Sequence, residues 1–280
     1  DLDGDGTINL FDAGALGGQG GSSNAGSNIG GGNRHTCVRA ENGSVYCWGD
    51  STGGRLGGEV TGSWEGPIAV SFDAFGEGVK THSISVGQTH SCAILDYSTA
   101  TNLTVDPVNE SSSVACWGGN SMGQVGNPTD SGGNSVWEPV VSLTQPGEAV
   151  IAVDAGSDHT CAILEGDSVQ CWGSNTAGQL GTGEFTVSEP PVFVSQLNGS
   201  GATAIASGAY HTCAIVNDGF VECWGENGNH QAGQEDQGSD YNNPESVELI
   251  DGAKAIAIDS GALFTCVLVE NGSVQCWGDN

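Results

Sequence analysis

The chain has 280 residues, of which 34 are acidic and five are basic, so its formal net charge at pH 7 is −29. A surface this acidic repels phosphate and anionic lipid headgroups, so we expect no nucleic-acid partner and no direct membrane insertion. Glycine contributes 47 residues and hydrophobic residues 37%, which is typical of many short strands joined by tight turns. No run of 18 apolar residues predicts a membrane span and no signal peptide opens the chain, so we expect a mature or excised fragment of a longer protein.

Residues 1–12 predict a calcium-binding loop, because oxygen-bearing side chains occupy the ligand positions of an EF-hand loop and Gly6 occupies its sharp turn. The expected metal ligands are Asp1, Asp3, Asp5, Thr7 through its backbone carbonyl, Asn9 and Asp12. The loop resembles a dockerin repeat or a thrombospondin type 3 repeat, which implies calcium as a cofactor. Asp12 departs from the usual bidentate Glu. The alternative is an acidic tail without an ordered ion, and residues 13–28 read as a Gly/Ser-rich linker.

One segment recurs five times after this linker. Its third copy reads HTCAILEGDSVQCWG from His159, and the Trp that closes each copy returns at intervals of 69, 55, 52 and 53 residues. A short apolar strand precedes each copy, and a loop and a strand led by proline follow the first four, at Pro67, Pro139, Pro191 and Pro244. Four strands in about 50 residues predict the blades of a β-propeller. The blades are expected near residues 29–71, 81–142, 149–195, 203–250 and 254–280, the last one incomplete.

Each copy predicts a β-hairpin, because two strand-like runs flank turn residues such as Asn217-Asp218-Gly219. With the turn centred on Asp218, Cys213 and Cys223 lie opposite each other, near the separation that a disulfide requires. The same reasoning predicts five disulfides: Cys37–Cys47, Cys92–Cys116, Cys161–Cys171, Cys213–Cys223 and Cys266–Cys276. Metal-binding Cys motifs are absent from the sequence. Disulfides indicate an oxidising compartment, so we expect an extracellular or cell-surface location.

The recurring pattern G-x-x-H-[TS]-x-A-x-x-x-x-G-x-V-x-x-W-G-x-N-x-x-G-Q-L-G resembles that of the regulator-of-chromosome-condensation (RCC1) repeat over residues 29–280. The third copy matches at Gly156, His159, Gly173, Asn175 and residues 178–181. The cysteine before each Trp is a departure that suggests a secreted, disulfide-bearing branch, and Phe264 replaces the histidine of the fifth copy. The resemblance implies an all-β propeller of four-stranded blades, commonly seven-bladed, of which five are visible here with one disulfide each.

The sequence offers no catalytic constellation. The repeat histidines, His35, His90, His159 and His211, form either a ring of ligands or bases, or a structural set that hydrogen-bonds loop backbone, and their repetition favours the structural role. The repeat Trp residues are expected to pack between blades. Nucleophile motifs, paired carboxylates and phosphate-binding loops are not recognisable, so we expect no enzyme.

Four residues are candidates for exposed binding contacts. Trp64 and Trp137 fall outside the repeat position and are expected in inter-strand loops. Asn102 and Asn109 lie in the polar insertion Asp96–Ser112, which lengthens one hairpin, as binding loops on rigid scaffolds often do. Both are also N-glycosylation acceptor patterns, as are Asn42, Asn198 and Asn271.

Taken together, these features predict a secreted or cell-surface, non-catalytic propeller that binds another protein or assembles with copies of itself. One alternative is an inhibitor of a secreted enzyme. The RCC1 resemblance implies a further alternative, a guanine-nucleotide exchange factor, but disulfides argue against a cytosolic or nuclear partner. An enzyme is the remaining, weaker alternative.

Overall fold

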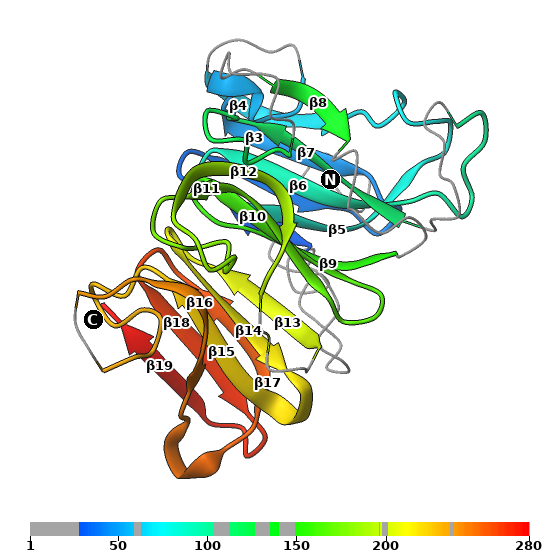
Figure 1. Cartoon of the computed structure of the whole chain (residues 1–280). Helices are drawn as coiled ribbons and strands as arrows, with labels where there is room; N and C mark the ends of the chain where they lie inside the picture. The colour runs from blue at the N-terminus through cyan, green and yellow to red at the C-terminus, as the bar shows by residue number, and fades with distance from the viewer. Residues whose placement is uncertain are drawn as a thin grey trace.

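The computed structural model of this chain describes residues 28–58, 63–103, 112–126, 135–139, 149–195, 197, 201–235 and 238–279. These residues form five antiparallel sheets that succeed one another along the chain, from blue to red in Figure 1. Their helical segments are three short 3₁₀ turns, η1 (Thr52–Gly54), η2 (Asn217–Gly219) and η3 (Ile250–Gly252). Within the described ranges, therefore, no helix is long and apolar enough to cross a membrane.

Each sheet is a meander in which neighbouring strands follow chain order. The first sheet contains β1 (Ile29–Gly31), β2 (His35–Arg39), β3 (Val45–Asp50) and β4 (Ser63–Val70). The second contains β5 (Lys80–Val86), β6 (His90–Asp96), β7 (Ser112–Gly118) and β8 (Ser135–Pro139). The third contains β9 (Val150–Ala155), β10 (His159–Leu164), β11 (Val169–Asn175) and β12 (Thr186–Phe193). The fourth contains β13 (Ala202–Ser207), β14 (His211–Val216), β15 (Phe220–Gly225) and β16 (Tyr241–Val247), and the fifth β17 (Ala255–Ser260), β18 (Phe264–Val269) and β19 (Val274–Gly278).

The sheets are the blades of a propeller, as predicted. The first strands of successive blades, β1, β5, β9, β13 and β17, contact one another and line a common central channel. Because each blade is a meander, its turns alternate between two rims. We call the rim with the turns between second and third strands the hairpin rim. The opposite rim, which holds the first-to-second turns and third-to-fourth loops, is the loop rim.

The disulfide prediction is confirmed in all five blades. In the fourth blade Cys213 lies opposite Cys223 in the register of β14 and β15, and the two are bonded. Asp218 and Gly219 both have positive φ, at 65° and 76°, as the tight turn between these strands requires. The other pairs repeat this register, including Cys92–Cys116, whose sequence separation is 24.

The hydrophobic core is divided into layers between consecutive blades. In β6, Cys92 and Ile94 pack towards the third blade, whereas Ala93 and Leu95 pack towards the first. Side chains of a strand alternate between the two faces of its sheet, so a blade in the middle of the propeller is apolar on both faces. In the second to fifth blades the repeat Trp enters the layer shared with the preceding blade, as Trp172 does. The predicted packing role is therefore confirmed for these four Trp residues.

The insertion between β6 and β7 begins as packed structure. Tyr97 is buried and its hydroxyl lies 2.6 Å from Ser113 Oγ. Thr101 and Glu77 exchange two backbone hydrogen bonds, and Leu103 packs on the layer between the first two blades. The first residues of this insertion thus follow the side of the second blade instead of projecting from its rim.

The outer strands begin earlier than predicted, so one expectation was wrong. Trp64 and Trp137 lie within β4 and β8, not in inter-strand loops. In β12, Pro190 and Pro191 occur inside the strand. Proline is tolerated there because an outermost strand has one edge without a ladder partner, so the missing N–H removes no sheet hydrogen bond.

In each blade a glycine begins the turn after the first strand, and its missing side chain leaves space for the ring of the His or Phe three residues later. A Cβ atom on Gly156 would lie 2.3 Å from His159 Cε1 and 2.6 Å from the Gly208 carbonyl oxygen. Gly261 has the same relation to Phe264, with a Cβ 2.2 Å from Phe264 Cε1. Histidine and phenylalanine therefore occupy one structural position, stacked against a glycine.

Replacement Gly156→Ala should lower the free energy of unfolding by about 1–3 kcal/mol, because the added methyl overpacks a rigid junction. Urea denaturation measures the loss. Gly31→Ala is the matched control, since a Cβ there meets nothing within 4 Å. Equal stabilities of the two variants would contradict the close packing described for Gly156.

Candidate functional site

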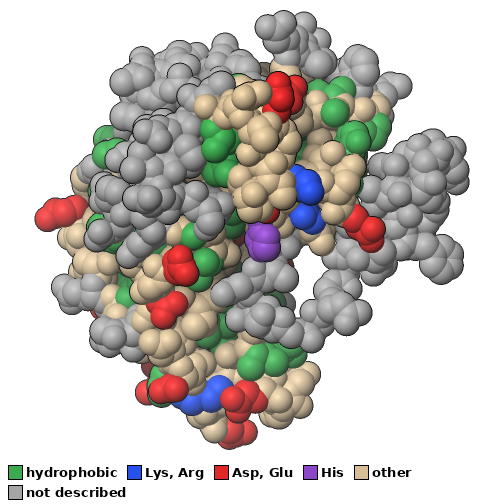
Figure 2. Space-filling view, turned by 90° about the vertical axis from the view of Figure 1, so that its right-hand side faces the viewer, with side chains coloured by type: hydrophobic (Ala, Val, Ile, Leu, Met, Phe, Trp, Pro, Cys, Tyr) green, Lys and Arg blue, Asp and Glu red, His purple; other side chains and the backbone are tan. Residues whose placement is uncertain are grey.

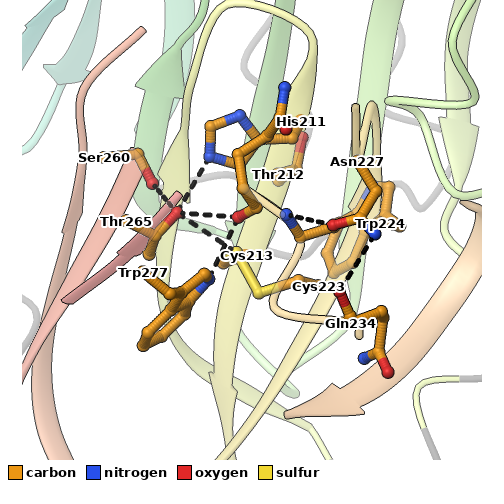
Figure 3. The surroundings of a disulfide bond; sticks show 12 residues. His211, Thr212, Cys213, Cys223, Trp224, Asn227, Gln234, Ser260, Thr265 and Trp277 are labelled. Atoms are coloured by element: carbon orange, nitrogen blue, oxygen red, sulfur yellow. Dashed lines mark hydrogen bonds between the residues drawn. A yellow bond between two sulfur atoms is a disulfide. The ribbon is translucent and has the colours of Figure 1, made fainter. Parts of the chain in front are cut away.

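Each blade junction is closed by a small polar network. Between the third and fourth blades, His159 Nε2 lies 2.9 Å from Thr212 Oγ1. The Thr212 hydroxyl donates to the Gln179 carbonyl at 3.0 Å, and Trp224 Nε1 donates to the same carbonyl at 2.8 Å. Figure 3 shows the next junction, where His211, Thr265 and Trp277 meet beside the Cys213–Cys223 disulfide. The histidine of one blade is thereby linked to the hydroxyl of the next.

The same link occurs at the two earlier junctions, with His35 Nε2 2.9 Å from Ser91 Oγ and His90 Nε2 2.8 Å from Thr160 Oγ1. The structural role expected for the histidines holds, but the expected partner was wrong. They contact a side-chain hydroxyl of the neighbouring blade instead of loop backbone. A hydroxyl can satisfy the imidazole and the loop carbonyl together, because it accepts one hydrogen bond while it donates another.

These histidines are neutral. Burial lowers the pKa of His35 and His211 to about 4 and the pKa of His90 and His159 to about 3. Because the Thr212 hydroxyl hydrogen is directed at Gln179, the Nε2–H of His159 must donate to Thr212. Nδ1 then carries no hydrogen, and at all four histidines it is buried without a hydrogen-bond partner among the described residues. The imidazoles thus act as interblade donors and do not line the channel.

The central channel forms a recess among the described residues. It is a cavity of about 660 Å³ lined by the five inner strands. A second recess of about 260 Å³ lies between the first-to-second turns of the blades, at the mouth of the channel on the loop rim. Two acids, Asp154 and Asp259, line the larger cavity, and its lining contains no Lys, Arg or His.

Asp154 joins three blades at this channel. Its Oδ1 accepts a hydrogen bond from Ser85 Oγ of the second blade at 2.9 Å, and its Oδ2 accepts one from the Ser207 N–H of the fourth. Ser85 Oγ in turn accepts from the Ala155 N–H. Burial raises the pKa of Asp154 to about 6, against the effect of these hydrogen bonds, and nearby Asp259 adds to the rise. The sequence reasoning missed Asp154, although an acid inside a short apolar inner strand was a signal for it.

The other predicted site residues do not gather at one place. The expected calcium ligands and Asn109 lie outside the described residues, as does Asn198. Asn102 is exposed in the insertion with φ at 50°, and Asn42 and Asn271 are exposed in hairpin turns. Among the side chains that the structure does describe, no group of three or more His, Cys, Asp or Glu could hold a metal ion.

Exposed apolar side chains occur on the loop rim. Phe185 is 53% exposed in the loop before β12, and Tyr210 is 39% exposed in the turn between β13 and β14. Val187 is exposed beside Phe185. On the face shown in Figure 2, acidic side chains appear at several separate places, so the negative charge is spread over this face of the molecule.

Two sequence profiles described as Regulator of chromosome condensation (RCC1) repeat match the chain. One matches residues 42–94, 113–163 and 167–215, and the other matches residues 27–55, 150–179, 202–231 and 255–280. The chain belongs to the RCC1 repeat family. Together the matches reach all five blades, so the RCC1 repeat accounts for the histidine, glycine and tryptophan positions that close the junctions.

Relatives and solved structures agree with this assignment. Human E3 ubiquitin-protein ligase HERC2 is 27% identical over 251 residues, which are 89% of this chain and 5% of HERC2. The crystal structure of human WBSCR16 covers 90% of this chain with a TM-score of 0.75 and 21% identity, and the match spans 61% of WBSCR16. Yeast RCC1 (Prp20) bound to Kap60 covers 89% of this chain, with a TM-score of 0.57, 17% identity and 69% of that protein matched. This chain therefore spans a small part of HERC2 and less than two thirds of WBSCR16.

Proposed function

We propose that this chain is a secreted or cell-surface RCC1-repeat propeller that binds a protein partner and carries out no catalysis. The observation that carries the proposal is the disulfide in every blade. Disulfides persist in oxidising compartments and are rare in the cytosol and nucleus. The same observation weighs against exchange-factor activity on a cytosolic or nuclear GTPase.

Protein binding is supported by the family and by the loop rim. Yeast RCC1, which shares the fold, has been solved bound to the protein Kap60. In this chain Phe185 and Tyr210 are exposed on the loop rim, and exposed aromatic side chains are enriched where proteins bind one another. The junction networks hydrogen-bond loop-rim backbone such as the Gln179 carbonyl, and ordering of this kind before binding reduces the conformational entropy lost when a partner binds.

The non-catalytic role is supported by the state of the histidines. Their lowered pKa values and buried interblade contacts leave them unable to reach a substrate in the channel or on a rim. Among the described residues, Asp154, whose pKa is raised to about 6, has Ser85 and Ser207 as hydrogen-bonding neighbours and no His or Lys base beside them.

Capture of a partner should depend on the loop rim. The oxidised chain is immobilised and exposed to secreted and surface proteins of its source. The double variant Phe185→Ser/Tyr210→Ser should weaken the captured protein's affinity at least 10-fold, because truncation of an interface aromatic costs about 2 kcal/mol or more. Phe220→Ser/Ile250→Ser, which alters two exposed residues elsewhere on the surface, is the control. Equal loss in both variants would contradict the assignment to the loop rim, and a saturable partner that is only the chain itself would indicate self-assembly.

We also propose that residues 1–12 bind calcium, as their ligand order suggests. Isothermal titration of the full chain with Ca²⁺ should show one site. The variant Asp3→Asn/Asp5→Asn should lower the affinity of this site for Ca²⁺ at least 10-fold. Asp218→Asn, on a hairpin turn, should leave the affinity unchanged. Unchanged binding in the first variant would place the calcium site elsewhere.

A further inference from the structure

Among the described residues that line the central channel, acidic side chains occur without a basic one. Asp154 and Asp259 lie on inner strands of different blades and both line the cavity of about 660 Å³. They are close enough for Asp259 to raise the pKa of Asp154. The lining residues that the structure describes include no Lys, Arg or His. Asp154 is half-buried and Asp259 is exposed. A carboxylate held partly out of water is stabilised by a nearby cation, and the described lining residues supply none.

A hydroxyl with spare hydrogen-bonding capacity stands beside this carboxylate. Ser207 is 7% exposed and lines both the channel and its mouth. Ser207 Oγ has no hydrogen bond of good geometry among the described residues, although it lies near Asp154. Each Asp154 oxygen accepts one hydrogen bond, from Ser85 Oγ at Oδ1 and from the Ser207 N–H at Oδ2, and can accept a second. The site therefore offers a charged acceptor and a hydroxyl to a ligand that donates hydrogen bonds.

We propose that the central channel binds an alkylammonium group, held by Asp154, by the Ser207 hydroxyl and by the field of Asp259. An ammonium carries the missing positive charge and has three N–H donors. The partly buried lining residues Ile205 and Ile258 would contact the alkyl chain. This inference extends beyond the proposed function and does not require a protein partner.

The depth of the site suits an alkyl chain of about four carbons. Asp154 is two residues before Gly156, which lines the channel mouth. At about 3.3 Å per residue along a strand, the carboxylate lies about 7 Å below that turn. A divalent metal fits less well, because it prefers several carboxylate ligands, and no group of three acids, His or Cys occurs among the described residues. The alkylammonium can come from a free amine or from a lysine side chain of a partner, which share this chemistry.

Isothermal titration at pH 7.5 with n-butylamine and with n-butanol tests the proposal on the full oxidised chain. We expect butylamine to bind at least 10-fold more tightly than butanol. Asp154→Asn should lower the affinity for butylamine at least 10-fold, and Ser207→Ala should lower this affinity by a smaller factor. Asp218→Asn, which removes an exposed acid on the hairpin rim, should leave it unchanged.

Three results would overturn the proposal: equal affinities for the amine and the alcohol, no measurable amine binding, or equal losses in Asp154→Asn and Asp218→Asn. Circular dichroism establishes that each variant is folded. Competition then distinguishes the two sources of the ammonium. Displacement of a captured partner by butylamine indicates a lysine side chain, and amine binding without displacement indicates a free amine. The titration does not depend on the outcome of the loop-rim capture experiment. The proposal of partner binding and the proposal of alkylammonium binding are therefore tested independently.

Discussion

Acidification from pH 7 to about pH 4 should unfold this protein, because four buried histidines must take up protons. Their folded-state pKa values, about 4 for His35 and His211 and about 3 for His90 and His159, lie below the value near 6.5 expected when unfolded. The unfolded state therefore binds more protons below pH 6.5, and stability falls as pH decreases. Each imidazole contributes up to about 1.4 kcal/mol per pH unit, so four contribute about 5 kcal/mol per unit.

Three acids with a raised pKa, Asp154, Asp158 and Glu226, act in the opposite direction, and Asp154 has the largest shift among them. Its pKa is raised to about 6, so the folded state binds more protons than the unfolded state between about pH 4 and pH 6. Its contribution to stability therefore increases as pH falls through this window, by about 3 kcal/mol in total. The histidine effect exceeds this and is comparable to the whole stability of a typical domain, about 5–15 kcal/mol.

Trp fluorescence and circular dichroism against pH measure the acid transition. His159→Phe is the informative variant, because the chain already carries Phe264 at the equivalent position of the fifth blade. It removes one titrating group, so the number of protons taken up on unfolding should fall by up to one. The slope of the unfolding free energy against pH should decrease accordingly. Stability that stays constant between pH 6.5 and pH 4 would contradict buried, neutral histidines.

Reduction of the five disulfides should destabilise the chain by more than any single substitution. Four disulfides close loops with a sequence separation of 10 and the fifth a loop of 24. A disulfide that closes a loop of about this size stabilises the folded state by roughly 3 kcal/mol. Loss of all five disulfides would therefore exceed the free energy of unfolding of most domains. The variant Cys161→Ala/Cys171→Ala should lose about 3 kcal/mol in urea denaturation, with added loss from the vacated core volume.

The order of reduction adds a sharper test. Cys266 and Cys276 are partly exposed, whereas the other eight cysteines have no exposed surface. A limiting amount of reductant, followed by alkylation and mass spectrometry, should therefore label Cys266 and Cys276 first. Simultaneous labelling of all ten cysteines under native conditions would mean that reduction proceeds through global unfolding instead of local access.

The blades and disulfides could be predicted from the sequence because their determinants are local. Turn residues such as Asn217-Asp218-Gly219 fix the hairpin register, and the register brings Cys213 opposite Cys223. The periodic return of the Trp-Gly pair then set the number of visible blades. The hairpin signals lie within one blade and the Trp-Gly period is read along the chain, so neither depends on how the blades pack.

The partners of the histidines and the role of Asp154 could not be predicted in the same way. His90 and Thr160 are 70 residues apart and meet only when two blades are stacked. Asp154 likewise contacts Ser85 and Ser207 of two other blades. The early start of the outer strands was missed because proline was taken as the beginning of a strand, whereas an outer edge accepts it within the strand.

The central claim is that all ten cysteines form disulfides in the native location of the protein. The fold, the expected stability and the proposed compartment all depend on this claim. Rapid acid quenching of the protein in its own source, followed by thiol alkylation and intact mass measurement, tests this claim most directly. We predict no alkylated cysteine before reduction and ten after it. Protein recovered with ten alkylated cysteines before reduction would place it in a reducing compartment and contradict the account.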